Sequence, residues 1–305
     1  MPDDDIEDFL NLFPKGRDKI RFTQQKILTD IKNELDKGTK FIIAEAPTGT
    51  GKSDIAATLA LCKKGGTILT TQKILQEQYT MEFPFLKSVK GENEFPCHQE
   101  DDKKQCDEGI CKFPNGTFCK HYVRQDQVEI TSGKGTKLEQ VQLTIPSRKT
   151  ECDYYLRTRM GEKASFTTYN YAKYFSSYLE DASKINDAQR ELLICDEAHR
   201  TTGIEDRSYW TIVHNNKRIH SRKRLYMTAT PRIYHNKIKA KMGDVLFSMD
   251  DENYGPELHK LSFTDAVHRY KCLSDYKVKI AIVPTDTVDE DFQMSIAGKN
   301  MSMPL

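Results

Sequence analysis

Residues 45–53 (EAPTGTGKS) have the types and spacing that suit chemistry on a nucleoside triphosphate. Glycines let such a loop curl until its backbone N–H groups face phosphate oxygens, and a following helix N-terminus adds positive potential. We predict that Lys52 contacts the β- and γ-phosphates and that the Ser53 hydroxyl ligates Mg²⁺. The apolar run before the loop and the helical pattern after it are the context that a phosphate-binding loop requires.

A second segment, residues 192–199 (LLICDEAH), places two carboxylates at the end of an apolar run. In open α/β sheets, ligands bind outside the carboxyl ends of the strands. Asp196 suits a partner of Mg²⁺, and Glu197 suits the polarisation of an attacking water. An acidic pair at a strand end is common by itself, but after a phosphate-binding loop it predicts that Lys52, Asp196 and Glu197 form one catalytic site.

A third segment, residues 227–232 (MTATPR), again follows an apolar run. Its hydroxyl side chains, Thr228 and Thr230, could hydrogen-bond the acidic pair and carry the state of the nucleotide to a nucleic-acid site. A plain turn is the alternative reading of this segment.

The elements that must position these residues are short β-rich runs alternating with helical patterns. Apolar spacing predicts helices over residues 23–35 and 53–61. Continuous apolar strands separated by helices are typical of a parallel sheet covered on both faces, so we expect an α/β fold. The predicted strands are residues 41–46, 67–71, 164–169, 191–197 and 224–230.

Charge is distributed unevenly along a chain whose net charge is only +1. Residues 214–241 contain nine Lys or Arg and no Asp or Glu. This run could meet phosphates, or it could be an ordinary solvated helix face. No apolar run reaches the roughly 18–20 residues of a membrane span, and the acidic start lacks the order of a signal peptide. We therefore expect a cytoplasmic protein without a membrane partner.

Five of the eight cysteines fall within residues 97–152, a polar stretch with weak periodicity that reads as an insert. In a cytosolic chain such clustering predicts a metal site more than disulfides. Four thiolates can hold a [4Fe–4S] cluster. Zinc is an alternative, although the tight Cys-x₂-Cys spacing of many zinc sites is absent. A set of unligated thiols is the third reading.

The order of these motifs resembles superfamily 2 helicases. Arg21-Phe-Thr-Gln24 resembles the upstream motif whose glutamine recognises adenine, and residues 70–72 (TTQ) resemble the motif that touches the nucleic-acid backbone. The resemblance implies a RecA-like motor domain, with His199 of the DEAH segment coupling to residues 228–230. The implied ATP-binding residues are Gln24, Ala46, Pro47, Thr48, Gly49, Thr50, Gly51, Lys52, Ser53 and His199.

The first 200 residues resemble the XPD and DinG group of iron–sulfur helicases. Residues 91–97 resemble the approach to that group's first cluster cysteine, and residues 152–155 (CDYY) resemble its last. The resemblance implies the cluster ligands Cys97, Cys111, Cys119 and Cys152, with Cys106 as the spare. Residues 169–171 (YNY) resemble the strand-end segment that follows. The implied nucleic-acid contacts are Thr70, Thr71, Gln72, Tyr169 and Tyr171.

From about Cys195 onward the chain resembles restriction-type DEAH helicases, on residues 199–203, 223–232, 254–258 and 274–276. The 28 residues between His199 and Thr228 are too few for the arch domain of the iron–sulfur group. The strand signal stops near Val283, before any second RecA-like domain. We expect a first motor domain over residues 1–96 and 153–283, a cluster insert over 97–152, and an unstructured or truncated tail over 284–305.

These resemblances imply an ATP-dependent DNA helicase that couples ATP hydrolysis to translocation on single-stranded or forked DNA. ATP, Mg²⁺ and a [4Fe–4S] cluster are its expected cofactors. A second RecA-like domain, in cis or in trans, is expected to be needed for full activity, so the chain alone should hydrolyse ATP slowly. The alternatives are a restriction-type DNA translocase subunit and a non-enzymatic nucleic-acid-binding remnant.

Overall fold

The computed structural model describes residues 3–98, 103–109, 129–131, 142–144, 152–205, 209–242 and 246–275. By its internal contacts the chain divides into a unit of Met1–Leu273 and a second of Ser274–Leu305. Everything below concerns the first unit. Cys111, Cys119 and the predicted tail over 284–305 lie outside the described residues.

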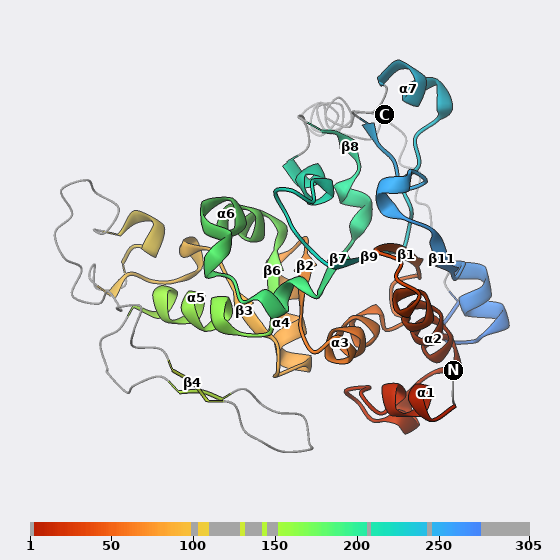
Figure 1. Ribbon diagram of the computed structural model, residues 1–305, viewed down its shortest axis with the longest axis horizontal. Helices are drawn as coiled ribbons and strands as arrows, with labels where there is room; N and C mark the ends of the chain where they lie inside the picture. Colours follow the sequence, from red (N-terminus) through yellow and green to blue (C-terminus); the bar gives the residue numbers. More distant parts are fainter. Residues whose placement is uncertain are drawn as a thin grey trace, which may run out of the picture. The chain divides into compact units, whose positions relative to one another are not determined.

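A seven-stranded sheet is the centre of the unit, and every pairing in it is parallel. Its order is β11-β1-β9-β7-β2-β6-β3 (Figure 1). The five predicted strands are all present, with ends shifted by one or two residues, and the predicted α/β fold is confirmed. The strands are β1 (Phe41–Glu45), β2 (Gly66–Thr70), β3 (Lys87–Val89), β6 (Phe166–Asn170), β7 (Leu192–Asp196), β9 (Lys223–Thr228) and β11 (Glu257–Lys260).

The two outermost strands, β3 and β11, do not appear among the predicted ones. Each occupies an edge of the sheet, and their sequences, KSV and ELHK, are short and polar. Edge strands need less apolar surface because one side faces solvent, so they lack the continuous apolar signal of central strands. Four further short strands form two small antiparallel pairs: β4 (Glu129–Thr131) with β5 (Gln142–Thr144), and β8 (Gly203–Ile204) with β10 (Leu246–Phe247).

Seven α-helices lie among the described residues, and the two predicted ones correspond to α2 and α3. None of the helices in the described ranges is long and apolar enough to cross a membrane. The helices are α1 (Asp3–Leu10), α2 (Phe22–Asp36), α3 (Lys52–Cys62), α4 (Lys73–Glu82), α5 (Asp153–Lys163), α6 (Tyr171–Asp181) and α7 (Asn236–Met242).

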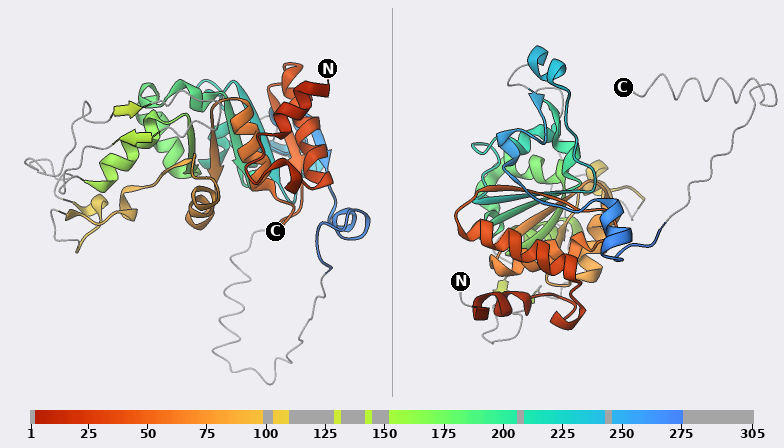
Figure 2. Two further views of the ribbon diagram at one scale, coloured as in Figure 1. Left: turned by 90° about the horizontal axis from the view of Figure 1, so that it is seen from below. Right: turned by 90° about the vertical axis from the view of Figure 1, so that its right-hand side faces the viewer.

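The sheet separates two hydrophobic cores, with one helical layer on each face (Figure 2). Side chains of α1, α2, α3 and α4 build the first core, and those of α6 with the segments around Val213 and Tyr254 build the second. Strand residues alternate between the cores: Ile194 belongs to the first, and Leu193 and Cys195 belong to the second. Because of this alternation, a side chain at a strand end is contacted by the helical layer of one particular face of the sheet.

Candidate functional site

The loop between β1 and α3 is shaped by residues that accept unusual backbone angles. Gly49 and Gly51 have φ angles of +87° and +84°, a region that side chains with a Cβ rarely adopt. The hydroxyl of Thr50 donates to the carbonyl of Pro47 at 2.7 Å and closes the turn. Thr48 and Gly49 are exposed at its tip. The loop therefore has the curled backbone that a phosphate-binding cradle needs.

Lys52 and Ser53 begin α3 directly after this loop. The Lys52 Nζ donates to the carbonyl of Ala46 at 3.1 Å, which holds the ammonium back over the loop. Lys52 is buried and Ser53 is half-buried. Both side chains thus start at the N-terminus of a helix, where an anion is favoured.

Asp196 ends β7, which lies next to β9 and one strand away from β1. Its side chain is 7% exposed, and burial raises the pKa of Asp196 to about 6, although the positive charge of Lys52 opposes this rise. Oδ1 accepts from the Glu197 backbone N–H at 3.0 Å. Lys52 and Asp196 therefore lie at the carboxyl-terminal end of the parallel strands, near enough for the charge of one to affect the other. A buried carboxylate near an ammonium suits a magnesium–phosphate complex, because the carboxylate can bind Mg²⁺ and the ammonium can bind phosphate.

Glu197 is held in a strained conformation. Its φ is +53°, a left-handed angle that costs a residue with a Cβ about 1 kcal/mol or more. Such strain persists where the surroundings impose it, and it concentrates at functional sites. The Glu197 Oε2 lies 3.4 Å from Nδ1 of His199.

His199 connects the acidic segment to the end of β9. Its Nδ1 is 3.2 Å from the hydroxyl oxygen of Thr228, and burial lowers the pKa of His199, which keeps the ring neutral at pH 7. We expected Thr228 and Thr230 to hydrogen-bond the acidic pair. Instead the Thr228 hydroxyl bonds His199 and the backbone of Thr230. The link to the carboxylates therefore passes through the imidazole.

Gln24 is 1% exposed and packs on the phosphate-binding loop. Its Oε1 accepts from the Arg21 backbone N–H at 3.0 Å, and its Nε2 lies 3.5 Å from both the Gly51 carbonyl and Asp54 Oδ2. The Arg21 guanidinium donates to the carbonyl of Gly49 at 3.3 Å. The upstream motif thus braces the loop, while adenine recognition by Gln24 stays a prediction.

The predicted nucleic-acid contacts separate into two groups. Gln72 is exposed and Thr71 half-buried just before α4, whereas Thr70 is fully buried and donates to the Gln72 carbonyl at 3.2 Å. Tyr169 and Tyr171 are 0% and 1% exposed.

Both rings are packed in the second core, so neither side chain is exposed, and a nucleic-acid contact at Tyr169 and Tyr171 stays a prediction. Tyr171 begins α6 and stacks on Trp210 with ring centroids 4.7 Å apart. The apolar spacing of α6 was the available signal, since residues at i, i+3, i+4 and i+7 share one helix face. Those core residues are Tyr171, Tyr174, Phe175 and Tyr178.

Two tyrosines that the sequence did not assign to the nucleotide site hold Asp196. The Tyr79 hydroxyl, from α4, donates to Asp196 Oδ2 at 3.2 Å. The Tyr171 hydroxyl donates to the Asp196 carbonyl at 3.0 Å. Spacing along α4 shows only that Tyr79 and Phe83 share an apolar face, so nothing local points to this contact.

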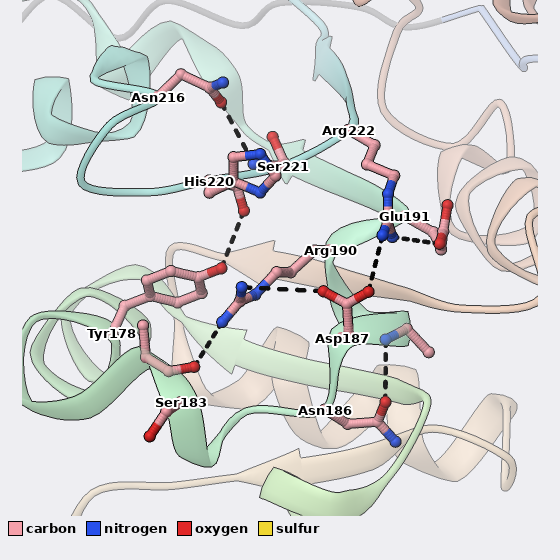
Figure 3. A network of polar contacts seen from close by, with 12 residues as sticks. Tyr178, Ser183, Asn186, Asp187, Arg190, Glu191, Asn216, His220, Ser221 and Arg222 are labelled. Atoms are coloured by element: carbon pink, nitrogen blue, oxygen red, sulfur yellow. Dashed lines mark hydrogen bonds and ion pairs between the residues drawn. The ribbon is translucent and has the colours of Figure 1, made fainter.

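The basic run over residues 214–241 does not form one phosphate-binding surface. Arg222 pairs with Glu191 and, at 2.8 Å, with Asp187, in the polar cluster at the start of β7 (Figure 3). Arg224 is fully buried. Because β9 begins at Lys223 and ends at Thr228, the residues around Arg222 lie at the amino-terminal end of the strand, and the site lies at the other end.

Three of the five clustered cysteines come together in a small core with Phe95 and Tyr154. They are Cys97, Cys106 and Cys152. The Sγ atoms of Cys106 and Cys152 are 4.0 Å apart, so the thiol that the resemblance leaves as the spare lies beside a predicted ligand. Within the described ranges, no group of three or more His, Cys, Asp or Glu could hold a metal ion. The described residues therefore do not complete a cluster site.

Residues 17–233 match the sequence family described as "Type III restriction enzyme, res subunit". The match includes both the phosphate-binding loop and the cysteine-rich stretch. It supports the restriction-type alternative at least as well as the iron–sulfur helicase reading, which it does not show. No curated protein matches the sequence.

Solved structures that resemble the chain include the following three. The ATP-dependent Type ISP restriction-modification enzyme LlaBIII bound to DNA shares 21% identity at a TM-score of 0.50, over 85% of this chain and 16% of its own. A nuclease-deletion mutant of the Type ISP enzyme LlaGI, in complex with a DNA substrate mimic, shares 20% at 0.48, over 85% and 18%. The Pyrococcus furiosus Hef helicase domain shares 16% at 0.43, over 79% and 37%. The chain thus spans about a sixth of the LlaBIII structure, whose likeness shows the fold.

Proposed function

The chain belongs to the family of type III restriction enzyme res subunits, and from this premise we propose that it is an ATP-hydrolysing motor domain of a restriction-type DNA translocase. The observation that carries the proposal is that Lys52 and Asp196 lie at the same end of the parallel strands, where the charge of Lys52 acts on Asp196. Lys52 begins α3 and Asp196 ends β7, and the two residues are 144 positions apart in the sequence. A phosphate-binding loop facing a buried carboxylate is what magnesium-dependent phosphoryl transfer requires.

The residues at this end of the strands each have a separate role in hydrolysis. Backbone N–H groups of the loop and the Lys52 ammonium bind the β- and γ-phosphates, and Ser53 with Asp196 would hold Mg²⁺. Bound Mg²⁺ neutralises the charge that develops on the phosphate oxygens. Glu197 orients the attacking water and accepts its proton. His199 transmits the state of this site to Thr228 at the end of β9.

Duplex DNA is the proposed track. Gln72, exposed ahead of α4, and the half-buried Thr71 offer polar groups for the phosphate backbone. The LlaBIII structure that shares the fold is bound to DNA. An iron–sulfur helicase would instead load on single-stranded or forked DNA, so the kind of DNA that stimulates hydrolysis separates the two readings.

The test measures nucleotide binding, and ATP hydrolysis with and without linear duplex DNA, for the wild type and Lys52→Ala. Lys87→Ala is the matched control, because that lysine belongs to the edge strand β3. We expect Lys52→Ala to lose ATP affinity about tenfold or more and to lose DNA-stimulated hydrolysis. Equal nucleotide binding by the wild type and Lys52→Ala would refute the motor proposal. Stimulation by forked but not by linear duplex DNA would favour the unwinding helicase.

We keep a metal in the cysteine-rich segment as a second candidate feature because Cys97, Cys106 and Cys152 lie in one cluster, although the described residues alone offer no group of three that could hold the ion. A tetrahedral zinc site places thiolates about 3.8 Å apart, close to the 4.0 Å between Cys106 and Cys152. A [4Fe–4S] cluster is the candidate from the sequence resemblance. Elemental analysis and absorbance near 400 nm after anaerobic purification distinguish iron, zinc and free thiols. Cys106→Ser should lower a zinc content but leave an iron content unchanged, because the resemblance makes Cys106 the spare thiol of the iron–sulfur site.

A further inference from the structure

Asp196 accepts hydrogen bonds from tyrosines on both faces of the sheet. On the side of the first core, the Tyr79 hydroxyl from α4 donates to Oδ2 at 3.2 Å. From the second core, the Tyr171 hydroxyl donates to the main-chain carbonyl at 3.0 Å. The backbone N–H of Glu197 donates to the other carboxylate oxygen, Oδ1, at 3.0 Å. Of these donors, only Tyr79 reaches the Asp196 carboxylate from a distant part of the chain.

Ser53 lies close enough to Tyr79 to affect its hydroxyl: burial raises the pKa of Tyr79, and the Ser53 side chain acts against this rise. A serine that binds a cation uses an oxygen lone pair, so its proton must go to another acceptor. The Tyr79 oxygen can accept a hydrogen bond from the Ser53 hydroxyl while the Tyr79 hydroxyl donates its own hydrogen bond to Asp196. Tyr79 can therefore connect Ser53 to Asp196, because its hydroxyl donates to Asp196 and its oxygen is free to accept from a nearby donor.

The ring of Tyr79 has little freedom to leave this position. It is 3% exposed, and its centroid lies 6.1 Å from that of Phe83, one helical turn further along α4. A side chain locked by packing holds its polar tip in a fixed direction, which is what a group that orients metal ligands must do.

We propose that Tyr79 is a positioning residue that orients both protein ligands of the magnesium–nucleotide complex, Ser53 and Asp196. This inference rests on the proposed function, because it assigns a role toward the same ATP site. In this role Tyr79 would act through Ser53 and Asp196 and not on the phosphates or the attacking water. Its loss should change how much Mg²⁺ the site needs more than how well the phosphate loop binds nucleotide.

The experiment compares the wild type with Tyr79→Phe, which keeps the ring and removes only the hydroxyl. Affinity for a fluorescent ATP analogue is measured at a series of Mg²⁺ concentrations and in EDTA. We expect the Mg²⁺ concentration for half-maximal tightening to rise about tenfold, as when a group supporting a metal ligand is removed. Affinity in EDTA should stay within about twofold of the wild type, because the phosphate loop is unchanged.

Two controls keep the outcomes separate. Tyr178→Phe removes another buried tyrosine hydrogen bond, to the His220 carbonyl at 2.9 Å, and should leave the Mg²⁺ dependence at its wild-type value. In a cycle with Ser53→Ala, the effects of the two substitutions should be less than additive, since both would break the same connection between Ser53 and Asp196.

An unchanged Mg²⁺ dependence in Tyr79→Phe, together with lost nucleotide binding in Lys52→Ala, would overturn this inference and leave the motor function standing. Wild-type nucleotide binding by Lys52→Ala would overturn the motor function itself. Equal weakening in EDTA and in Mg²⁺ would show that Tyr79 supports the fold rather than the metal ligands.

Discussion

His199 Nδ1 lies 3.2 Å from the hydroxyl oxygen of Thr228, and this contact joins the ends of two adjacent strands, β7 and β9. The same Nδ1 is 3.4 Å from Oε2 of Glu197. The imidazole thus lies between the carboxylate of Glu197, which is proposed to orient water, and Thr228, the last residue of β9. Because burial keeps His199 neutral, its Nδ1 can donate to one neighbour or accept from the other, depending on which tautomer is present.

Thr228→Val should separate ATP binding from DNA-stimulated hydrolysis. The substitution keeps the shape of the side chain and removes the hydroxyl that contacts His199. We expect ATP affinity to stay unchanged and the DNA-stimulated rate to fall about tenfold, the loss of one hydrogen bond to an active-site group. Steady-state ATPase assays with and without duplex DNA measure both quantities. Thr67→Val, which removes a buried hydroxyl bonded to Thr167, serves as the control, and an equal loss there would assign the effect to folding.

Asp196→Asn should stabilise the protein at neutral pH in the absence of Mg²⁺. The folded pKa of about 6 lies above the ordinary 3.8, so between these values the folded state binds more protons than the unfolded state. The stability contributed by this carboxyl is therefore complete below about pH 4 and is lost as the pH rises through 6. A shift of two pKa units corresponds to about 3 kcal/mol. The asparagine carries no such penalty.

Urea unfolding at pH 4.5 and pH 7.5 measures this difference. The variant should exceed the wild type by about 2–3 kcal/mol at pH 7.5, with the gap shrinking at pH 4.5. Magnesium and ATP should then stabilise the wild type more than the variant, because the lost charge is the one that binds the cation. A variant less stable than the wild type at both pH values would contradict the burial argument.

Glycine and alanine at position 197 should differ in stability. Glu197 has a φ of +53°, which glycine adopts freely and alanine does not. We expect Glu197→Gly to be more stable than Glu197→Ala by about 1 kcal/mol in thermal or urea unfolding. Both lack the carboxylate, so both should lose ATP hydrolysis by about 10²-fold. Equal stability of the two would mean that the backbone at this position relaxes out of the left-handed region.

Gln72 and Tyr169 should behave oppositely in DNA binding. Gln72 is exposed, and Gln72→Ala should weaken the affinity for duplex DNA about three- to tenfold by removing one polar contact. Tyr169→Phe should leave that affinity unchanged because the ring is buried. Its hydroxyl has no hydrogen-bond partner among the described residues, so its removal should stabilise the fold by about 1 kcal/mol. Fluorescence anisotropy and thermal unfolding test the pair, and weaker DNA binding by Tyr169→Phe would establish it as a contact.

The sequence by itself determined the alternation of strands and helices and the two halves of the nucleotide site. Such features are local: an apolar run predicts a buried strand, and a glycine-rich loop before a helix predicts a phosphate cradle. The short polar edge strands β3 and β11 carry too weak a local signal. Their pairing depends on a neighbour that is distant in the sequence.

Only the tertiary structure decided which way the remaining side chains face. Tyr79 and Asp196 are 117 residues apart, and α4 must pack on the first face of the sheet before they meet. In the sequence Tyr171 directly follows a predicted strand, where a contact with nucleic acid was expected. In the structure it begins α6, and its ring packs in the second core. Arg222 and Arg232 share one basic run but flank β9 at opposite ends. The direction of a side chain is set by the burial of segments remote in the sequence, and no local pattern contains that information.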